Sequence, residues 1–576
     1  MEMIENIRHS TAHILAQAVQ KLFKDVKLGI GPTIENGFYY DFDLPQQITE
    51  EDLKKIEEEM KKIIKQKQEF EQEEITKVQG IKLFEKQPYK IELIEEISEK
   101  GEKLTKVQNG PFIDFCRGGH VKNTSELGNF KLLKLAGAYW KGNAKNRQLQ
   151  RIYGTAWETK EELKEYLQML EEAKKRDHKV IGEQQEIYMI SNLIGKGLPI
   201  WLPNGEIIKE QIENFVKETE KNHGYLRVCT PHLAKEELFL KSGHLPHYEE
   251  SMYPKMVMDD GTYYLKAMNC PLHHLIYNKK QRSYKELPLR LAEYGTVYRN
   301  ELSGTLSGLS RVRMLSMNDA HIYCTKEQIE DEVKGVIQMI EDYYKIFNFK
   351  NYHYRLSLWN KNNKEKYINE PENWDYTEKK LRKVLKELNT NFKEIEDEAA
   401  FYGPKIDIQF KNVYGKEETM STIQLDFAAK SRFNLKYVDN DSHHNNEVFV
   451  IHRAPLSTHE RFIAYLIEHY AGKFPIWLSP IQIVVMTVAD RHIEYAKEIA
   501  KEFEKYNLRV EVDGSGESIA KKVRNAIKIK IPYQITIGDK ELGNPTLAIR
   551  TRENKIIELD KEEFIEKIKV EIKEKC

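Results

Sequence analysis

The chain has 576 residues, which at ~150 residues per domain suggests three or four domains and excludes a single small binding module. Hydrophobic residues make up 40% of the sequence and charged residues 31%, so several cores with a well-solvated surface are expected and global disorder is not. Lys and Arg total 90 against 91 Asp and Glu, so the net charge of -1 provides no overall basic field, and any nucleic acid must bind to local patches.

The cysteines and the first residues indicate the compartment. Five cysteines are scattered along the chain, too few for a disulfide framework and typical of a reducing environment. They are Cys116, Cys229, Cys270, Cys324 and Cys576. The start of the chain lacks a basic stretch followed by an apolar run, and no apolar segment reaches the ~18 residues that cross a bilayer. We therefore expect a soluble cytoplasmic protein with no signal peptide and no membrane contact.

The N-terminal third mixes helices with short strands. Residues 37–41 predict a strand, and the charge-dense run 50–77 carries Ile56, Met60, Ile63 and Ile64 at helical spacing, which predicts a solvated amphipathic helix. Residues 160–178, rich in Glu and Lys, predict a helical connector. We expect an N-terminal α+β domain over residues 1–160 and a linker over 161–179.

In the rest of the chain, the pattern of predicted strands and helices changes after Pro480. Before it, apolar and aromatic runs at 261–266, 405–410 and 447–452 alternate with helices, which predicts one large α+β domain on a mostly antiparallel sheet over residues 180–475. After it, strands at 481–488, 509–513 and 533–538 alternate with helices at 493–505 and 518–529. This alternation predicts a small α/β domain over residues 476–576.

The first chemical pattern is an HxxxH followed by a CxxxH. His9 and His13 share one helix face, roughly opposite the apolar residues Ile7, Ile14, Ala18 and Leu22. An HxxxH alone is a weak signal, but Cys116 and His120 add a thiol and a third imidazole. Such a set can form a metal site or a polar pocket for acid–base chemistry.

Two further patterns lie in the central domain. Arg299 can bind a phosphate while the nearby Glu301 carboxylate accepts a hydrogen bond from an adenine amino group, and Arg311 follows ten residues later. Surface ion pairs give the same sequence pattern. Cys270, His321 and His452 can supply three zinc ligands and leave an open coordination position. Their separations of 51 and 131 residues carry no diagnostic weight, so spacing alone favours a buried Cys and two ordinary His.

Taken in order, the most specific strings cover nearly the whole chain and resemble the threonyl-tRNA synthetase family of class II aminoacyl-tRNA synthetases. They include IRHSTAHILAQAV, IGPTIENGFYYDFD, KAMNCP, LPLRLAEYGTVYRNE, NDAHIYC, AFYGPKIDI, TIQLDF and IHRAPLSTHERF. The resemblance implies a class II catalytic core on an antiparallel sheet, an N-terminal α+β editing domain and a C-terminal α/β anticodon-binding domain. It implies a threonine–tRNA ligase that uses ATP, L-threonine and tRNA(Thr), and a homodimer in which the segment around Val228 forms an interface strand.

The resemblance also implies roles for individual residues in the synthetic site. Zinc would be held by Cys270, His321 and His452, and Mg²⁺ would accompany ATP. ATP would contact Arg299, Glu301, Arg311 and Arg461. Threonine would contact Asp319, Tyr402 and Gln424 with Lys405 nearby, and His244 would assist transfer to the tRNA ribose.

Two other sites follow from the resemblance. The editing pocket would be lined by His9, His13, Tyr40, Lys90, Asp114, Cys116 and His120. Related alanyl editing domains bind zinc with the same pairs, but the threonyl family is described without it, so we assign no metal there. Glu541 and Arg550 match positions that read anticodon bases.

The chemistry explains why two sites are needed. A zinc with an open position can bind both the amino group and the side-chain hydroxyl of threonine, and valine has no oxygen for the second bond. Serine makes both bonds, and one methyl is worth only about 1 to 3 kcal/mol, so the synthetic site must also accept serine. A second, hydrolytic site that clears Ser-tRNA(Thr) corrects this error.

The sequence departs from the family pattern at several positions. Leu315 stands where an aromatic residue usually stacks on adenine, and Met317 replaces a usual glutamine. Ser457 replaces a glycine, Gly119 a proline and Gly516 an asparagine. The chain also begins directly at the editing helix, whereas the family usually has a ubiquitin-like domain first. These departures leave open a regulatory or editing-only tRNA- or mRNA-binding protein and, less favoured, a serine or proline synthetase.

Overall fold

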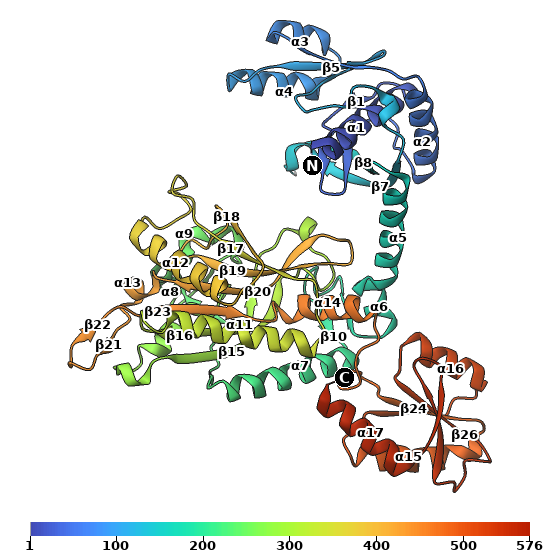
Figure 1. Ribbon diagram of the computed structural model, residues 1–576, viewed down its shortest axis with the longest axis vertical. Helices are drawn as coiled ribbons and strands as arrows, with labels where there is room; N and C mark the ends of the chain where they lie inside the picture. The colour runs from blue at the N-terminus through green and yellow to red at the C-terminus, as the bar shows by residue number, and fades with distance from the viewer. Residues whose placement is uncertain (1, 144, 576) are drawn as a thin grey trace. The chain divides into compact units, whose positions relative to one another are not determined.

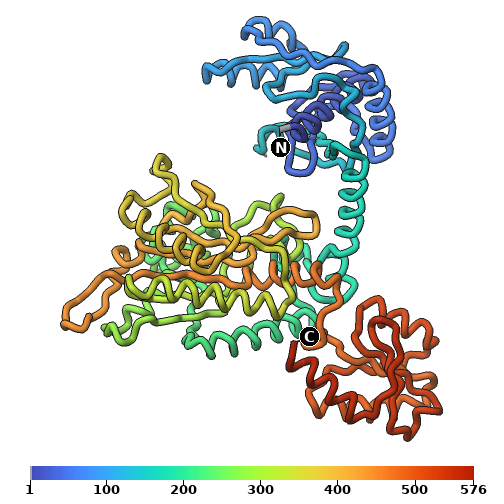
Figure 2. The backbone as a smooth tube through the Cα atoms, viewed as in Figure 1, coloured from blue at the N-terminus to red at the C-terminus, as the bar shows by residue number. Residues whose placement is uncertain are grey.

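The structure is a computed structural model that describes residues 2–143 and 145–575. The chain folds into two compact units, Met1–Glu171 and Glu172–Cys576 (Figure 1). Figure 2 traces the backbone through the first unit and then the second. Cys576 lies outside the described residues, and the other four cysteines are free thiols. Within the described ranges, every helix is too short or too polar to span a bilayer.

The first unit contains two antiparallel sheets. One has strand order β1-β3-β8-β7, with β2 paired to β3, and the other has the order β4-β5-β6. The strands are β1 (Lys27–Leu28), β2 (Thr33–Ile34), β3 (Gly37–Asp43), β4 (Phe70–Glu74), β5 (Thr105–Asn109), β6 (Phe112–Phe115), β7 (Phe130–Tyr139) and β8 (Gln148–Ala156). The helices are α1 (Glu2–Leu22), α2 (Glu50–Lys65), α3 (Lys77–Leu83) and α4 (Pro88–Glu99), and α5 (Lys160–Arg176) continues past the end of the unit at Glu171.

The first unit differs from the sequence prediction in two places, at the end of α1 and at the end of α2. Helix α1 contacts β3 and β8, and Leu22 at its end is 42% exposed rather than part of the apolar stripe, whereas His13 is buried. Helix α2 ends at Lys65, so the prediction of one helix over the whole run 50–77 was wrong. Lys67 has a φ of 54°, in the left-handed region that ends helices, and the following residues pair as β4 with β5.

The second unit is built on an eight-stranded sheet with the order β11-β15-β16-β23-β20-β19-β17-β18. All neighbours are antiparallel except β11 with β15 and β17 with β18. These strands are β11 (Leu226–Arg227), β15 (Leu289–Tyr298), β16 (Met314–Cys324), β17 (His353–Ser357), β18 (Phe392–Ile395), β19 (Lys405–Lys411), β20 (Glu417–Asp426) and β23 (Phe449–Ala454). The predicted mostly antiparallel sheet is therefore confirmed.

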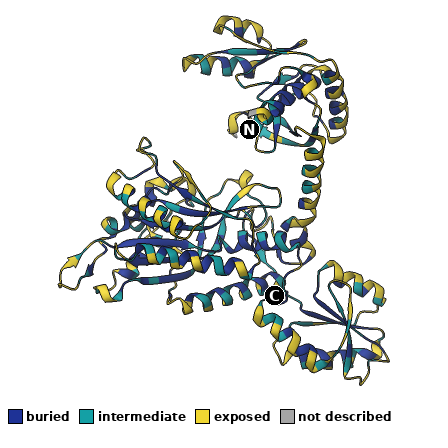
Figure 3. Cartoon of the chain, in the orientation of Figure 1, coloured by how far each residue is buried: buried dark blue, intermediate teal, exposed yellow. Residues whose placement is uncertain are grey.

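Helices and small sheets surround the large sheet. The helices are α6 (His178–Gln184), α7 (Pro203–Asn222), α8 (Glu236–Ser242), α9 (His244–His247), α10 (Cys270–Tyr277), α11 (Ile329–Ile346), α12 (Pro371–Glu387), α13 (Ala429–Phe433) and α14 (His459–Tyr470). The small strands are β9 (Tyr188–Met189), β10 (Ile200–Trp201), β12 (Leu233–Lys235), β13 (Met256–Met258), β14 (Gly261–Leu265), β21 (Tyr437–Val438) and β22 (His444–Asn445). Helix α11 contacts β16, β20 and β23, and Figure 3 shows buried strands with exposed outer faces on the helices.

The last hundred residues form a five-stranded sheet with the order β25-β24-β26-β27-β28. Strands β24 (Ile483–Thr487), β25 (Val510–Asp513) and β26 (Tyr533–Ile537) are parallel, whereas β27 (Thr546–Thr551) and β28 (Ile556–Asp560) add antiparallel partners. The helices are α15 (Ile493–Glu504), α16 (Ile519–Lys528) and α17 (Lys561–Glu574). The predicted alternation of strands and helices is confirmed, with bounds that differ by one or two residues.

Candidate functional site

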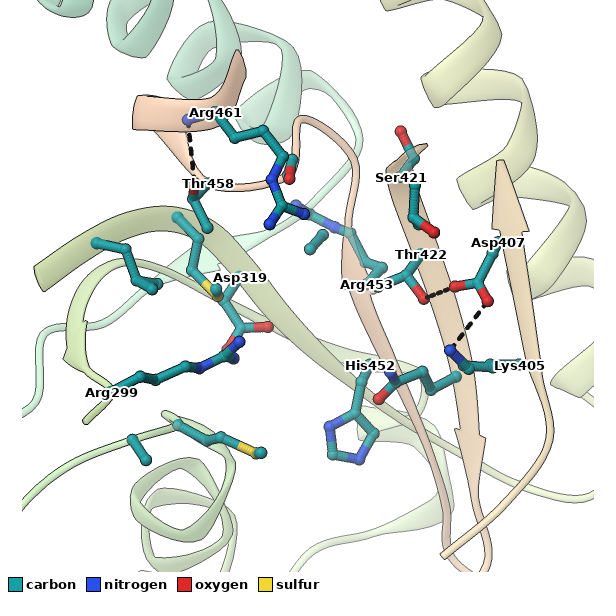
Figure 4. Close-up of a pocket in the computed structure, with 18 of the residues that line it drawn as sticks. Arg299, Asp319, Lys405, Asp407, Ser421, Thr422, His452, Arg453, Thr458 and Arg461 are labelled. Atoms are coloured by element: carbon teal, nitrogen blue, oxygen red, sulfur yellow. Dashed lines mark hydrogen bonds and ion pairs between the residues drawn. The ribbon is translucent and has the colours of Figure 1, made fainter. Parts of the chain in front are cut away.

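A cavity of about 410 Å³ lies over the large sheet of the second unit (Figure 4). Its walls come from β16, β19, β20 and β23, from the loop after β15 and from the start of α14. Eleven of the predicted site residues line it: Cys270, Arg299, Glu301, Arg311, Asp319, His321, Tyr402, Lys405, Gln424, His452 and Arg461. The structure therefore brings together nearly all residues predicted for the synthetic site.

The register of the sheet explains this convergence. His321 on β16 lies opposite His452 on β23, and His452 lies opposite Gln424 on β20. Gln424 in turn lies opposite Lys405 on β19. Directly opposed residues point to the same face of a sheet, so four residues that are far apart in the sequence form one row across four strands. Asp319, two residues before His321, shares that face.

Cys270, His321 and His452 form a candidate metal centre at one end of this row. Each offers one ligand atom, and these atoms lie within 4.8 Å of one another among buried side chains. Burial raises the pKa of the Cys270 thiol well above its ordinary value and lowers the pKa of His321 well below. A bound divalent cation favours the thiolate, and one sulfur with two imidazole nitrogens is a donor set that suits zinc.

A chain of buried polar groups extends behind His321. The His273 Nε2 lies 2.9 Å from Glu293 Oε2, and the His273 Nδ1 lies 2.8 Å from the Nδ1 of His321. Since the carboxylate accepts, a neutral His273 carries its proton on Nε2, and its Nδ1 then accepts from His321. His321 is left with a free lone pair on Nε2, as a metal ligand requires.

Glu293 is held ionised by the groups around it. Burial raises its pKa, but hydrogen bonds from His273 and Thr230 and the charge of Lys266 outweigh burial and lower the pKa to about 2. The Lys266 Nζ lies 3.3 Å from Glu293 Oε1. This buried carboxylate can therefore orient His273 over the physiological pH range.

The residues predicted to bind threonine are held by hydrogen bonds and an ion pair, with one another or with neighbouring polar side chains. Tyr402 donates to Gln424, and Asn269 Nδ2 donates to Asp319 Oδ2 over 3.1 Å. Lys405 Nζ lies 3.0 Å from Asp407 Oδ2, and Thr422 donates to the same carboxylate over 2.8 Å (Figure 4). Asp407 thus holds the Lys405 ammonium at the cavity wall.

The predicted ATP residues lie on the other side of the cavity. Arg311 pairs with Glu301 at 2.8 Å, and Arg461 Nε donates to the Ser310 carbonyl over 3.1 Å. Arg461 stands in the first turn of α14, whose N-cap Thr458 accepts from the Arg461 backbone N–H. Figure 4 shows Arg299 and Arg461 approaching the cavity from different elements. Three guanidinium groups in one pocket can neutralise a polyphosphate.

Among the described residues, His244 is not part of the lining of the main cavity. It lines a smaller adjoining cavity together with Cys270, Tyr402 and His452. Its Nδ1 lies 2.7 Å from the Ser242 hydroxyl. Burial lowers the pKa of His244 to about 4, so the ring is neutral near pH 7.

Three departures from the family pattern, Leu315, Met317 and Ser457, line the cavity, and a fourth, Gly119, lies in the first unit. Leu315 is packed against Val297 and Val312. Ser457 has a φ of 53°, which explains why glycine is usual at this position. At Gly119 an added Cβ would lie 2.4 Å from the Asn6 Oδ1, so the side chain of Asn6 occupies the space of the missing ring.

The first unit brings together all seven residues predicted for the editing pocket. Cys116 Sγ lies 3.1 Å from His9 Nε2 and 3.8 Å from His120 Nε2. The donor atoms of His9, His13, Cys116 and His120 lie within 4.8 Å of one another. Burial raises the pKa of Cys116 to about 12 and lowers the pKa of His120 to about 3, so thiol and imidazole are neutral.

A buried ion pair supports this pocket. Lys90 Nζ lies 2.5 Å from Asp114 Oδ1 and donates to Tyr40 Oη over 3.0 Å, while Tyr40 donates to Asp114 Oδ2 over 2.5 Å. His13 Nδ1 lies 3.6 Å from the same carboxylate. A pocket with neutral imidazoles next to a fixed ammonium and carboxylate can position water and a substrate ester.

The two predicted anticodon residues lie at the C-terminal sheet. Glu541, in the loop after β26, accepts from the backbone N–H of Gly538 over 2.8 Å. Arg550 on β27 donates to Asn554 Oδ1 over 2.6 Å. At Gly516 an added Cβ would meet no atom within 4 Å, so this position offers no side chain to a base. Base reading by these residues stays a prediction.

Sequence reasoning missed several residues of the site. Asp407 lies two residues after Lys405 on one strand, and this i, i+2 spacing puts both on one face. His273 lies three residues after Cys270 on α10, a spacing that also places both on one face. These spacings were the available signals. Nothing in the sequence indicated Glu293 as the partner of His273.

Comparison with known proteins adds independent information. The family described as "tRNA synthetase class II core domain (G, H, P, S and T)" matches residues 255–470, "Anticodon binding domain" matches 482–571, and "Threonyl and Alanyl tRNA synthetase second additional domain" matches 104–153. A threonine–tRNA ligase of Geobacillus sp. is 46% identical over 576 residues, covering 99% of this chain and 89% of the relative. One from Streptococcus gordonii is 47% identical over 575 residues, covering 99% and 88%.

A solved structure is similar as well. The crystal structure of the RNA binding domain of threonyl-tRNA synthetase from Cryptosporidium parvum matches with a TM-score of 0.65 and 32% identity. The match covers 68% of this chain and 98% of that chain.

Proposed function

The chain belongs to the threonyl-tRNA synthetase family, and from this premise we propose that it ligates L-threonine to tRNA(Thr) through a threonyl-adenylate and hydrolyses mischarged Ser-tRNA(Thr). The observation that carries the proposal is the row His321, His452, Gln424 and Lys405 across four strands, which faces three arginines over one cavity. A regulatory or editing-only protein would need neither the row nor the arginines.

In the activation step the threonine carboxylate attacks the α-phosphate of ATP and pyrophosphate leaves. Arg299 would contact the α-phosphate and the carboxylate, while Arg311 and Arg461 would neutralise the leaving pyrophosphate together with Mg²⁺. Glu301 would accept from the adenine amino group. Lys405, held by Asp407, adds a fixed positive charge at the threonine end of the cavity.

Cys270, His321 and His452 would hold one zinc ion. A zinc ion held by them would supply a Lewis acid that binds the amino group and the hydroxyl of threonine. Tyr402, Gln424 and Asp319 would orient the amino acid around it, and His244 would accept a proton from the tRNA ribose through the neutral ring described above.

We propose that the first unit edits. Ser-tRNA(Thr) would enter the pocket of His9, His13, Cys116 and His120, with Lys90 and Asp114 orienting the ester, and we assign no metal to the pocket. Glu541 and Arg550 would read the anticodon. The homodimer and the cytoplasmic location belong to this proposal as well.

Pyrophosphate exchange with a panel of amino acids tests the synthetic function. We expect exchange with threonine, weaker exchange with serine and none with valine. Absence of threonine-dependent exchange by zinc-loaded protein would favour the regulatory alternative. Cys270→Ala should lose about one equivalent of zinc together with exchange, and retained metal would contradict the assigned centre.

Deacylation of Ser-tRNA(Thr) tests the editing function separately. The variant His9→Ala with Cys116→Ala should let mischarged tRNA accumulate while threonine-dependent exchange stays at the parent level. Clearance at the parent rate would show that editing occurs elsewhere.

A further inference from the structure

A buried histidine outside the cavity contacts the loop that carries Ser310 and Arg311 of the cavity lining. His178 is the first residue of α6 and is 4% exposed. It is not among the residues that line the cavity. No role for it follows from the sequence analysis or from the proposed mechanism above.

Both ring nitrogens of His178 have defined partners. The backbone N–H of Leu309 donates to His178 Nε2 over 3.2 Å, and His178 Nδ1 lies 2.7 Å from Glu468 Oε1. A backbone N–H can only donate, so Nε2 carries the lone pair and Nδ1 carries the proton that Glu468 accepts. The Asp177 carboxylate lies 3.8 Å from Nδ1, but with both nitrogens engaged the three groups do not form an open metal site.

Leu309 belongs to a tight turn over residues 307–311, which we call the 307–311 turn. Ser310 N–H donates to the Ser307 carbonyl over 2.9 Å, and Ser307 N–H donates to the Arg311 carbonyl over 3.2 Å. Gly308 in this turn has a φ of 49°, and an added Cβ there would lie 2.3 Å from His178 Nε2. The turn therefore packs directly on the imidazole.

The 307–311 turn carries one predicted ATP residue, Arg311, and contacts a second, Arg461. Ser310 and Arg311 line the cavity, and the Ser310 carbonyl accepts from Arg461 Nε. Arg461 and Glu468 are seven residues apart on α14, which places them on one helix face. Helix α14 thus holds the turn at two adjacent residues, directly through Arg461 and indirectly through Glu468 and His178.

We propose that His178 is a positioning residue for ATP: its Nε2 lone pair fixes the Leu309 N–H and thereby sets the 307–311 turn, so that Arg311 and Arg461 meet the triphosphate. This inference rests on the proposed function. It assigns His178 no contact with ATP, threonine or the reacting atoms. Its loss should weaken ATP use and leave threonine recognition unchanged, because the row on the sheet lies on other elements.

The test uses the whole 576-residue chain, loaded with zinc, in threonine-dependent pyrophosphate exchange. For His178→Ala we expect the KM for ATP to rise about five- to tenfold, in keeping with the loss of one buried hydrogen bond, while the KM for threonine stays within about twofold. Zinc content should be unchanged. His469→Ala, which removes a partly buried ring from the same helix α14, is the matched control and should leave both KM values at the parent level.

Two conservative variants distinguish positioning from packing. In His178→Gln the amide oxygen reaches the place of Nε2 and can accept from Leu309, so the KM for ATP should return to within about threefold of the parent value. In His178→Asn the shorter side chain reaches only the place of Nδ1, so the KM should stay raised. If His178→Ala does not fold, this pair alone decides the question.

Several results would overturn the inference. They are an unchanged KM for ATP in His178→Ala, equal KM values in the Gln and Asn variants, or a parallel rise in the KM for threonine. A parent protein without exchange would instead refute the proposed function. In that case, direct titration of ATP into parent and variants still tests the inference, because equal ATP affinities would contradict it.

Discussion

Replacing His273 by alanine tests whether the buried, hydrogen-bonded side chains behind the metal centre support zinc binding. His273 links Glu293 to His321 through contacts of 2.9 and 2.8 Å, and all three side chains are buried. Without it, His321 loses the acceptor that fixes its tautomer and ring orientation. Loss of such an outer partner typically weakens metal affinity by about 10- to 100-fold, which corresponds to about 1.4 to 2.7 kcal/mol.

Competition with a chromophoric chelator measures the zinc affinity without relying on activity. The matched control is His274→Ala, because His274 is the next residue on α10 and is also buried. Its ring packs edge-on against His321 and His452, but its Nδ1 hydrogen bond goes to Tyr323 Oη at 2.9 Å, so it tests packing without the tautomer-fixing bond. We expect the affinity to fall at least tenfold in His273→Ala and less than threefold in the control. Equal losses in both variants would refute the tautomer reasoning and leave only a general packing effect.

Three further predictions concern other parts of the molecule. Lys90→Met leaves the buried Asp114 carboxylate without its cationic partner, although Tyr40 still donates to it, so the first unit should lose about 3 to 5 kcal/mol of stability. Hydrogen exchange on β6 checks this, and a loss below about 1 kcal/mol would contradict it. Burial lowers the pKa of His120 from its ordinary 6.5 to about 3, so its contribution to stability should be complete above about pH 6.5 and be lost as the pH drops from 6.5 toward 3. A melting temperature of the first unit that does not change on lowering the pH through this range would argue against it. Leu315→Phe should lower the KM for ATP about threefold by ring stacking on adenine, and an unchanged KM would mean that adenine does not lie over this residue.

The secondary structure of the chain was largely predictable from its sequence. The alternating pattern after Pro480 predicted the order of strands and helices there, because each short element carries its own periodicity. The run 50–77 shows where this reasoning failed. Charge and helical spacing continue to Lys65, but pairing of β4 with β5 is a contact between residues distant in the sequence, and it overrides local preference.

The sequence motifs alone identified the family of this protein and the types of chemical group at its sites. Only the tertiary structure decided which groups meet. The cross-strand register places His321, His452, Gln424 and Lys405 in one row, and a shift of one residue on any strand would turn its member to the opposite face. The contacts of His273 with Glu293 and of His178 with Leu309 depend on packing between elements 20 to 131 residues apart. Hydrogen-bond partners over such distances are chosen by the packed fold, because no periodicity within a single segment encodes them.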